Sequence, residues 1–182
     1  MKDRRSVRTD KAIREAFLTL LVNKSVNNIT VTEISELADI GRGTFYLHYK
    51  DPYDLLERIE DEVVDGIEKS IQQPYSENSE AGLMECVEKS AEYMNRYTDL
   101  CKALLSSKEY AQFMGKLVRL FTRLISPKVE QQEFQRFHTA FLVSGAIGML
   151  IAWITSDVEM VPKEVARTVA DIFEHIGKPV GL

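Results

Sequence analysis

The stretch from Thr30 to Lys50 limits the fold of this chain more than any other, because it holds two helix signals around one turn signal. Thr30 and Glu33 have the spacing of a capping box, in which two residues satisfy each other's backbone amides at a helix start. Apolar residues then follow at helical spacing. Asp39 tolerates the left-handed backbone of a turn, and Gly41 places no side chain there. A short helix, a tight turn and a second helix are therefore predicted.

The second helix is expected from about Arg42 to Tyr49, with Phe45 on its inner face. A helix-turn-helix can lay this second helix in the major groove of DNA. An Arg fork can bond a guanine edge, and hydroxyl or ammonium groups can donate to phosphates. The residues predicted to contact DNA are Thr32, Arg42, Gly43, Thr44, Tyr46, Leu47, His48 and Lys50. Spacing alone leaves open a helical hairpin that binds no DNA, because such shapes recur without it.

A resemblance to the TetR family of bacterial transcriptional regulators is carried by residues 29–56, ITVTEISELADIGRGTFYLHYKDPYDLL. The usual form in that family is T-V-x-x-I-A-x-x-A-G-V-S-x-G-T-F-Y-x-H-F-K-x-K-x-x-L. The chain departs from it at Asp39, where Gly is usual, and at Gly41, where Ser is usual. Asp suits the turn and Gly suits an N-cap, so the motif is expected to fold. The resemblance implies an all-α protein, with an N-terminal three-helix helix-turn-helix domain and a C-terminal helical domain for ligand binding and dimerisation.

The remainder of the chain also has helical patterns, with no strand alternation or internal repeat. A basic arm over residues 1–8 is predicted to be mobile, either as a frayed end or as a segment that reaches DNA. The first helix is expected from Thr9 to about Asn23. Later helices are expected over about 52–73, 80–97, 99–105, 108–125, 130–156 and 162–176. We predict a DNA-binding domain over residues 1–51 and a regulatory and dimerisation domain over residues 52–182.

Charge is distributed unevenly between these two parts. The whole chain has a net charge of -5, yet residues 1–50 hold nine Lys or Arg against six Asp or Glu, a balance of +3. The remainder therefore carries -8. This asymmetry favours binding of nucleic acid at the N-terminal end only.

Other classes of function find little support in the residues. Cys86 and Cys101 lack metal-ligand spacing and are expected to be reduced thiols, with a redox switch as the alternative. Without a phosphate loop, a nucleophile elbow or a metal-spaced cluster, we predict no catalytic residue, metal or cofactor, and no enzyme.

The uncharged segment from Thr139 to Ser156 is interpreted as a helix at a subunit interface rather than a membrane span. The absence of a signal peptide predicts a cytoplasmic protein.

The same segment carries small residues in a row, at every fourth position from Ala140 to Ala152. Such a row lets another helix approach closely, and Gly costs about 1 kcal/mol in a helix unless packing compensates. In the TetR family the last two long helices of each subunit form a four-helix dimer interface. The C-terminal sequence is similar to a type that includes regulators of dihydroxyacetone-kinase operons. We predict a homodimer whose interface contains Ala140, Phe141, Ser144, Gly145, Gly148, Ala152, Val169 and Phe173.

The middle helices carry aromatic and Met side chains at helical spacing, which either form ordinary core or line an effector pocket. The candidates for effector binding are Met84, Val87, Tyr93, Met94, Tyr97, Phe113, Leu117 and Phe121. The sequence thus predicts a homodimeric repressor that binds a double-stranded DNA operator and is released by a small-molecule effector. An activator or co-regulator that works with a partner protein, and a dimeric scaffold without DNA binding, remain as alternatives.

Overall fold

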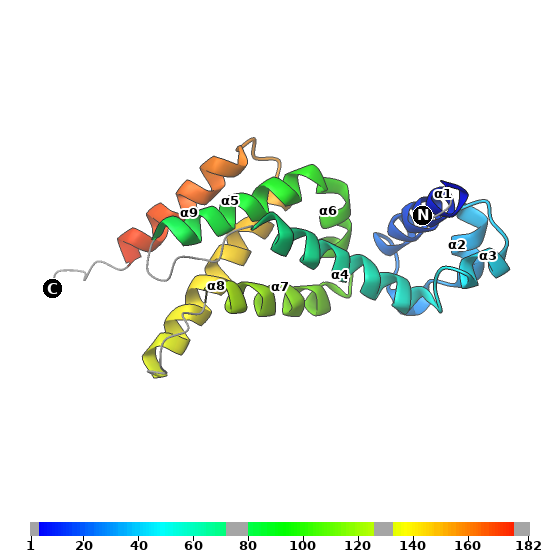
Figure 1. Ribbon diagram of the computed structural model, residues 1–182, viewed down its shortest axis with the longest axis horizontal. Coiled ribbons are helices and arrows are strands. Elements are labelled where there is room, and N and C mark those ends of the chain that lie inside the picture. Colours follow the sequence, from blue (N-terminus) through cyan, green and yellow to red (C-terminus); the bar gives the residue numbers. More distant parts are fainter. Residues whose placement is uncertain (1–3, 72–79, 126–132, 177–182) are drawn as a thin grey trace. The chain divides into compact units, whose positions relative to one another are not determined.

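The computed structural model describes residues 4–71, 80–125 and 133–176, and every regular element in these ranges is a helix (Figure 1). The prediction of an all-α fold is therefore confirmed. The elements are α1 (Arg4–Leu21), η1 (Val26–Asn28), α2 (Val31–Leu37), α3 (Arg42–Tyr46), α4 (Pro52–Ser70), α5 (Glu80–Arg96), α6 (Thr98–Ser106), α7 (Tyr110–Ile125), α8 (Glu133–Thr155) and α9 (Pro162–Ile176).

These helices form two compact units. The first contains the described residues up to Val63 together with Asp99–Phe113, and the second contains Val64–Thr98 and the described residues from Met114 onward. Helices α4 and α7 each pass from one unit into the other. The predicted domain boundary after residue 51 remains a prediction, and the structure adds that the α6–α7 region belongs to the same compact unit as α1 to α3.

Helix α1 begins at Arg4 rather than at Thr9. The prediction of a mobile arm is therefore wrong for residues 4–8, while residues 1–3 lie outside the described residues. Neither Gly nor Pro occurs in this segment, and Arg is a good helix former, so nothing local stops the helix from extending backward. Ile13, Phe17 and Leu21 lie at helical spacing on the inner face of this helix and are at most 1% exposed.

The capping box at the start of α2 is present as predicted. The Glu33 amide donates to the Thr30 hydroxyl at 3.2 Å, and the Thr30 amide donates to the Glu33 carboxylate at 3.0 Å. Beyond the helix, Asp39 has a φ of 53°, which is the left-handed backbone expected of the turn. These two local features set the angle at which the chain enters α3.

Helix α3 ends at Tyr46, so the predicted helix to Tyr49 is too long by its last turn. Two distant groups account for the early end. The His48 carbonyl accepts a hydrogen bond from Arg58 at 3.3 Å, and the Tyr49 hydroxyl donates to Asp10 of α1 at 2.7 Å. These contacts hold the segment after α3 and place the buried Tyr49 side chain against α1.

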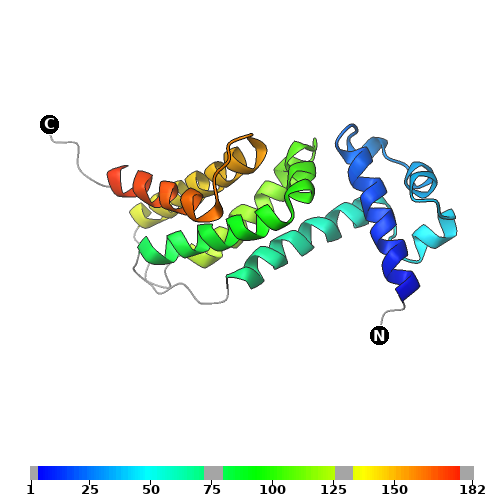
Figure 2. The ribbon, with the colours of Figure 1, turned by 90° about the horizontal axis from the view of Figure 1, so that it is seen from above.

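The second unit is built around three helices, α5, α8 and α9, of which α5 and α9 run side by side (Figures 1 and 2). Their inner faces form one apolar core. Its fully buried members include Val87, Ala91, Val143, Ala146, Ala166 and Val169. In the described part of the chain, no helix is both long enough and apolar enough to cross a membrane.

Gly66 of α4 marks a close approach within this second unit. A Cβ atom added at Gly66 would overlap the ring of Tyr93 from α5. The Tyr93 ring also lies against the Tyr97 ring, with 4.7 Å between centroids. Tyr93 therefore has a packing role that is independent of any effector.

Candidate nucleic-acid interface

The start of α3 presents an open edge to solvent. Gly41 is the N-cap of this helix, and both Arg42 and Gly43 are exposed. Apart from the helix's own backbone and the adjacent residues, no atom of the described chain lies within 4 Å of the position that a Cβ at Gly43 would occupy. An exposed backbone with free space at a helix N-terminus allows close approach of a phosphate or a base edge.

The other residues predicted to contact DNA lie around this edge. Thr32, Tyr46, Leu47 and Lys50 are exposed, whereas Thr44 and His48 are half-buried. Leu47 is 85% exposed and Tyr46 is 59% exposed, which is unusual for such large apolar groups. The structure therefore places these residues in and around α2 and α3. The aromatic side chain of Tyr46 and the aliphatic side chain of Leu47 are exposed there.

The orientation of α3 depends on Phe45, which has no exposed surface. Its ring meets Tyr46 edge to face at 5.7 Å and lies 5.9 Å from Tyr49. Phe45 fills the core of the helix-turn-helix, while its neighbours Arg42 and Tyr46 are exposed. Truncation of Phe45 would remove this anchor, and removal of a buried Phe costs about 3–5 kcal/mol.

His48 is held by α1 rather than left free. Its Nδ1 lies 3.5 Å from the Asp10 carboxylate, which also accepts the Tyr49 hydroxyl. Burial, followed by the hydrogen bond to Asp10, raises the pKa of Tyr49 well above its usual value of 10. The hydroxyl therefore remains a donor at all ordinary pH values, and the predicted DNA contact of His48 has a competing partner in Asp10.

Arg58 of α4, to which no sequence motif pointed, supports the segment after α3. Besides the His48 carbonyl, it contacts Asp54 at 3.1 Å and lies 5.3 Å above the Tyr49 ring. Asp54 in turn accepts the Lys50 amide at 2.9 Å. This backbone hydrogen bond, together with Arg58, lowers the pKa of Asp54 below 3.8. The backbone of Lys50 is thus fixed while its side chain stays exposed.

The start of α2 is held by charge as well as by its capping box. The Lys24 ammonium pairs with Glu33, and this pair together with the Thr30 groups lowers the pKa of Glu33 from 4.5 to about 2. The folded-state pKa is depressed, so the stabilisation is present above about pH 4.5. It is lost as the pH falls through about 2.

Glu109, in the turn between α6 and α7, contacts the start of η1 within the first unit. One carboxylate oxygen accepts the Ser25 hydroxyl and, at 3.1 Å, the Val26 amide at the start of η1. The second oxygen is buried and has no hydrogen-bond partner in the described part of the chain. One turn later, Gln112 donates to Glu60 of α4 at 3.2 Å. Ser25 and Glu109 are 84 residues apart, so local sequence patterns could not predict their contact.

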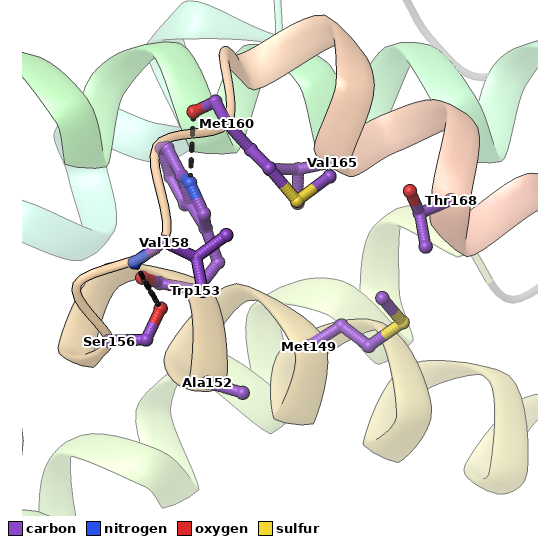
Figure 3. Close-up of a pocket in the computed structure, with 8 residues that line it drawn as sticks. All are labelled: Met149, Ala152, Trp153, Ser156, Val158, Met160, Val165 and Thr168. Carbon is purple, nitrogen blue, oxygen red and sulfur yellow. Dashed lines mark hydrogen bonds between the residues drawn. The ribbon is translucent and has the colours of Figure 1, made fainter.

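The predicted effector residues lie mostly in the core. Val87, Met94, Phe113, Leu117 and Phe121 are at most 3% exposed. Met84 and Tyr93 are half-buried, and Tyr97 is 42% exposed. A pocket of about 340 Å³ lies elsewhere, between the end of α8 and α9, and none of these eight residues lines it (Figure 3). Effector binding by the predicted residues remains a prediction.

The row of small residues on α8 faces outward in the single chain. Ala140, Ser144, Gly148 and Ala152 are exposed and Gly145 is half-buried, while Phe141, on the same helix, is 52% exposed. Val169 is different, because it is fully buried against the core of its own protomer. A place for Val169 in a dimer interface remains a prediction, and α9, which carries this residue, packs against α5 and α8 of the same chain. The side chain of Phe173 lies outside the described residues.

The two cysteines are buried in apolar surroundings. Burial raises the pKa of Cys86 to about 11 and that of Cys101 to about 12. Both are neutral thiols near pH 7, which disfavours a redox role. Within the described ranges, no group of three or more His, Cys, Asp or Glu side chains could hold a metal ion.

Comparison with known proteins decides the family. The TetR_C_8 model, described as the C-terminal region of a transcriptional regulator, matches residues 83–175, which is more than half of the chain. The chain belongs to the TetR family of transcriptional regulators. The matched span lies outside residues 29–56, so the two parts of the chain support the assignment separately.

A relative in Bacillus subtilis, the uncharacterized HTH-type transcriptional regulator YxbF, is 21% identical over 166 residues. The match covers 88% of this TetR-family chain but 43% of the relative, so the chain spans less than half of that protein's length.

Solved structures of regulators share the fold. A TetR regulator from Streptococcus agalactiae has a TM-score of 0.63 and 24% identity, covering 94% of this chain and 96% of its own. NalD, the secondary repressor of the MexAB-OprM multidrug efflux pump in Pseudomonas aeruginosa, has a TM-score of 0.68 and 16% identity, covering 95% and 97%. DhaS, a dihydroxyacetone kinase operon activator, has a TM-score of 0.54 and 16% identity, covering 92% and 95%.

Proposed function

We propose that this TetR-family regulator is a homodimeric repressor that binds a double-stranded DNA operator and leaves it when a small molecule binds. The observation that carries the proposal is the open edge of α3, where Arg42 and Gly43 are exposed and Phe45 anchors the helix in the core. Exposed Arg4, Arg8 and Lys11 of α1 add positive charge to the same unit. Phosphates favour such charge, and base edges favour the Arg fork.

The experiment that tests this function is a gel shift with duplexes from the upstream region of the gene, with scrambled duplexes as controls. We expect a retarded band on the upstream duplex that survives competition by scrambled DNA. If the protein binds neither duplex at low salt, it acts as a dimeric scaffold and the proposal fails.

A second candidate function is transcriptional activation. It is favoured by the resemblance of the C-terminal part to regulators of dihydroxyacetone-kinase operons and by the shared fold with DhaS, which is an activator. Deletion of the gene should raise the transcript level of the target genes for a repressor. A fall in those transcripts would favour the activator or a co-regulator with a partner protein.

Dimerisation through α8 is supported by an exposed surface that suits a close helix contact. Apart from the local helix backbone and the adjacent residues, no atom of the described ranges lies within 4 Å of a Cβ placed at Gly148. The exposed Phe137 and Phe141 provide further apolar area on the same helix. We expect Gly148→Leu to weaken dimerisation because the added side chain separates the two helices. Sedimentation velocity over a concentration series measures the shift.

Ala111→Leu is the matched control, because it adds an aliphatic side chain at an exposed position on α7. It should leave association unchanged. A native protein that sediments as a monomer at micromolar concentration would contradict the dimer, and equal weakening by both variants would contradict the role of α8.

The effector response is proposed to run through helices that belong to both compact units. Helices α4 and α7 each pass from the first unit into the second, so a change among the middle helices can reach residues beside the DNA-binding region. Glu109 and Gln112 supply contacts there. The effector must bind the two states of the protein with different affinity, and typical couplings are about 1–3 kcal/mol.

A further inference from the structure

We propose that the pocket between the C-terminal end of α8 and the N-terminal half of α9 binds an uncharged aromatic small molecule. This site is separate from the middle-helix residues considered above, and it does not depend on operator binding. The pocket has a volume of about 340 Å³. Its lining consists of Met149, Ala152, Trp153, Ser156, Val158, Met160, Val165 and Thr168.

The pocket is braced within a single chain. The Trp153 indole N–H donates to the Met160 carbonyl at 3.0 Å, which ties the α8–α9 connection back onto α8 (Figure 3). Ser156 donates to the Trp153 carbonyl at 2.9 Å and accepts the Val158 amide at 3.3 Å. These bonds hold the α8–α9 connection in place beside the pocket.

The chemistry of the walls selects an uncharged ligand. None of the eight lining residues carries a charge. The polar side chains already have partners, since Thr168 donates to the Glu164 carbonyl at 2.9 Å and Trp153 and Ser156 are bonded as described. A charged ligand would lose its hydration there without gaining a partner, which is costly.

The side chains that converge on the pocket favour an aromatic ring. Figure 3 shows Met160 above and Met149 below a common space, with Trp153 on one side and Thr168 on the other. Thioether groups make favourable contacts with aromatic rings, and an indole adds a further π surface. The volume lies near the lower end of the range for small-molecule sites, which suits one to two fused rings.

Trp153 is the only tryptophan in the sequence, so its fluorescence can report binding in the pocket that it lines. The probe is N-phenyl-1-naphthylamine, which is uncharged, aromatic and able to accept energy from an excited indole. We expect saturable quenching of Trp153 fluorescence with one probe per chain. The sulfonated analogue 8-anilinonaphthalene-1-sulfonate should bind roughly tenfold or more weakly, because its charge has no partner in the pocket.

Two filling variants test the location. Ala152→Leu enters the pocket from α8 and Thr168→Leu enters it from α9, and each should weaken probe binding roughly tenfold or more. Ala140→Leu is the matched control, because Ala140 belongs to the same exposed row on α8 but does not line the pocket. It should bind the probe like the native protein, and circular dichroism verifies that all three variants fold.

Three results would overturn the proposal. The first is native quenching in both filling variants, which would place the probe elsewhere. The second is an equal loss of probe binding in Ala152→Leu and Ala140→Leu, which would mean that the exposed face of α8, and not the pocket, binds the probe. The third is quenching that disappears when the protein concentration is raised into the range where copies associate, which would mean that a second copy fills the pocket.

Discussion

Replacing Arg42 by Ala should weaken binding to the true operator by about 1–3 kcal/mol for each half-site, and binding to random DNA far less. Arg42 is the first residue of α3 and is exposed, so its fork can reach a guanine edge at the point where recognition helices meet bases. Because a dimer uses the residue twice, the total loss on the operator can double. The half-sites should be related by two-fold symmetry and lie about one helical turn apart or a multiple of it.

Lys50 provides the contrasting variant. It follows the last turn after α3, its amide is bonded to Asp54, and its side chain is exposed. A flexible ammonium at that position suits a phosphate rather than a base. Lys50→Ala should therefore weaken binding to operator and random DNA nearly equally. It should also reduce the slope of log affinity against log salt by about 1.

The measurement is a set of binding isotherms for both variants on operator and scrambled duplexes across a salt series. Equal losses on the two duplexes for Arg42→Ala would remove its base-reading role. An unchanged salt slope for Lys50→Ala would remove its phosphate contact. The two variants thus control for each other, because each is expected to change a quantity that the other leaves nearly constant.

Local signals in the sequence predicted the parts of this fold that local chemistry determines. The capping box of Thr30 and Glu33 depends on residues three positions apart, and the turn at Asp39 depends on a single backbone angle. The inner face of α1 is formed by apolar residues at helical spacing for the same reason. Such features need no knowledge of the rest of the chain.

Features that depend on distant residues could not be predicted in this way. The end of α3 is set by Arg58 and Asp10, which approach only after folding. The apolar face of α9 was visible in the sequence, but periodicity cannot tell whether a face meets its own chain or a second copy, and only the structure shows that Val169 is buried within the single chain. The pocket beside Trp153 likewise depends on how α8 and α9 pack.

Glu109 has the largest expected effect among the residues that only the structure revealed. Glu109→Ala leaves the Val26 amide and the Ser25 hydroxyl without their acceptor, and an unsatisfied buried donor costs about 1–3 kcal/mol. The rate of amide hydrogen exchange over residues 25–47 should therefore rise roughly 5- to 150-fold where exchange follows this local opening. Glu109→Gln should change it less, because the amide carbonyl can still accept the Val26 N–H. Glu85→Ala, at an exposed position on α5, is the control and should change nothing in this segment.

A coupling role for Glu109 requires more than local stability, and linkage supplies the test. If the α6–α7 turn responds to the state of the helix-turn-helix, then binding of operator DNA must in turn change the α6–α7 turn. Operator binding to the native protein should slow amide exchange over residues 99–113, and Glu109→Ala should abolish most of this slowing even at saturating DNA. The same slowing in Glu109→Ala as in the native protein would show that the contact is structural only. Slowing that is lost in Glu109→Ala but kept in Glu109→Gln would assign the coupling to the hydrogen bond with Val26 rather than to the negative charge.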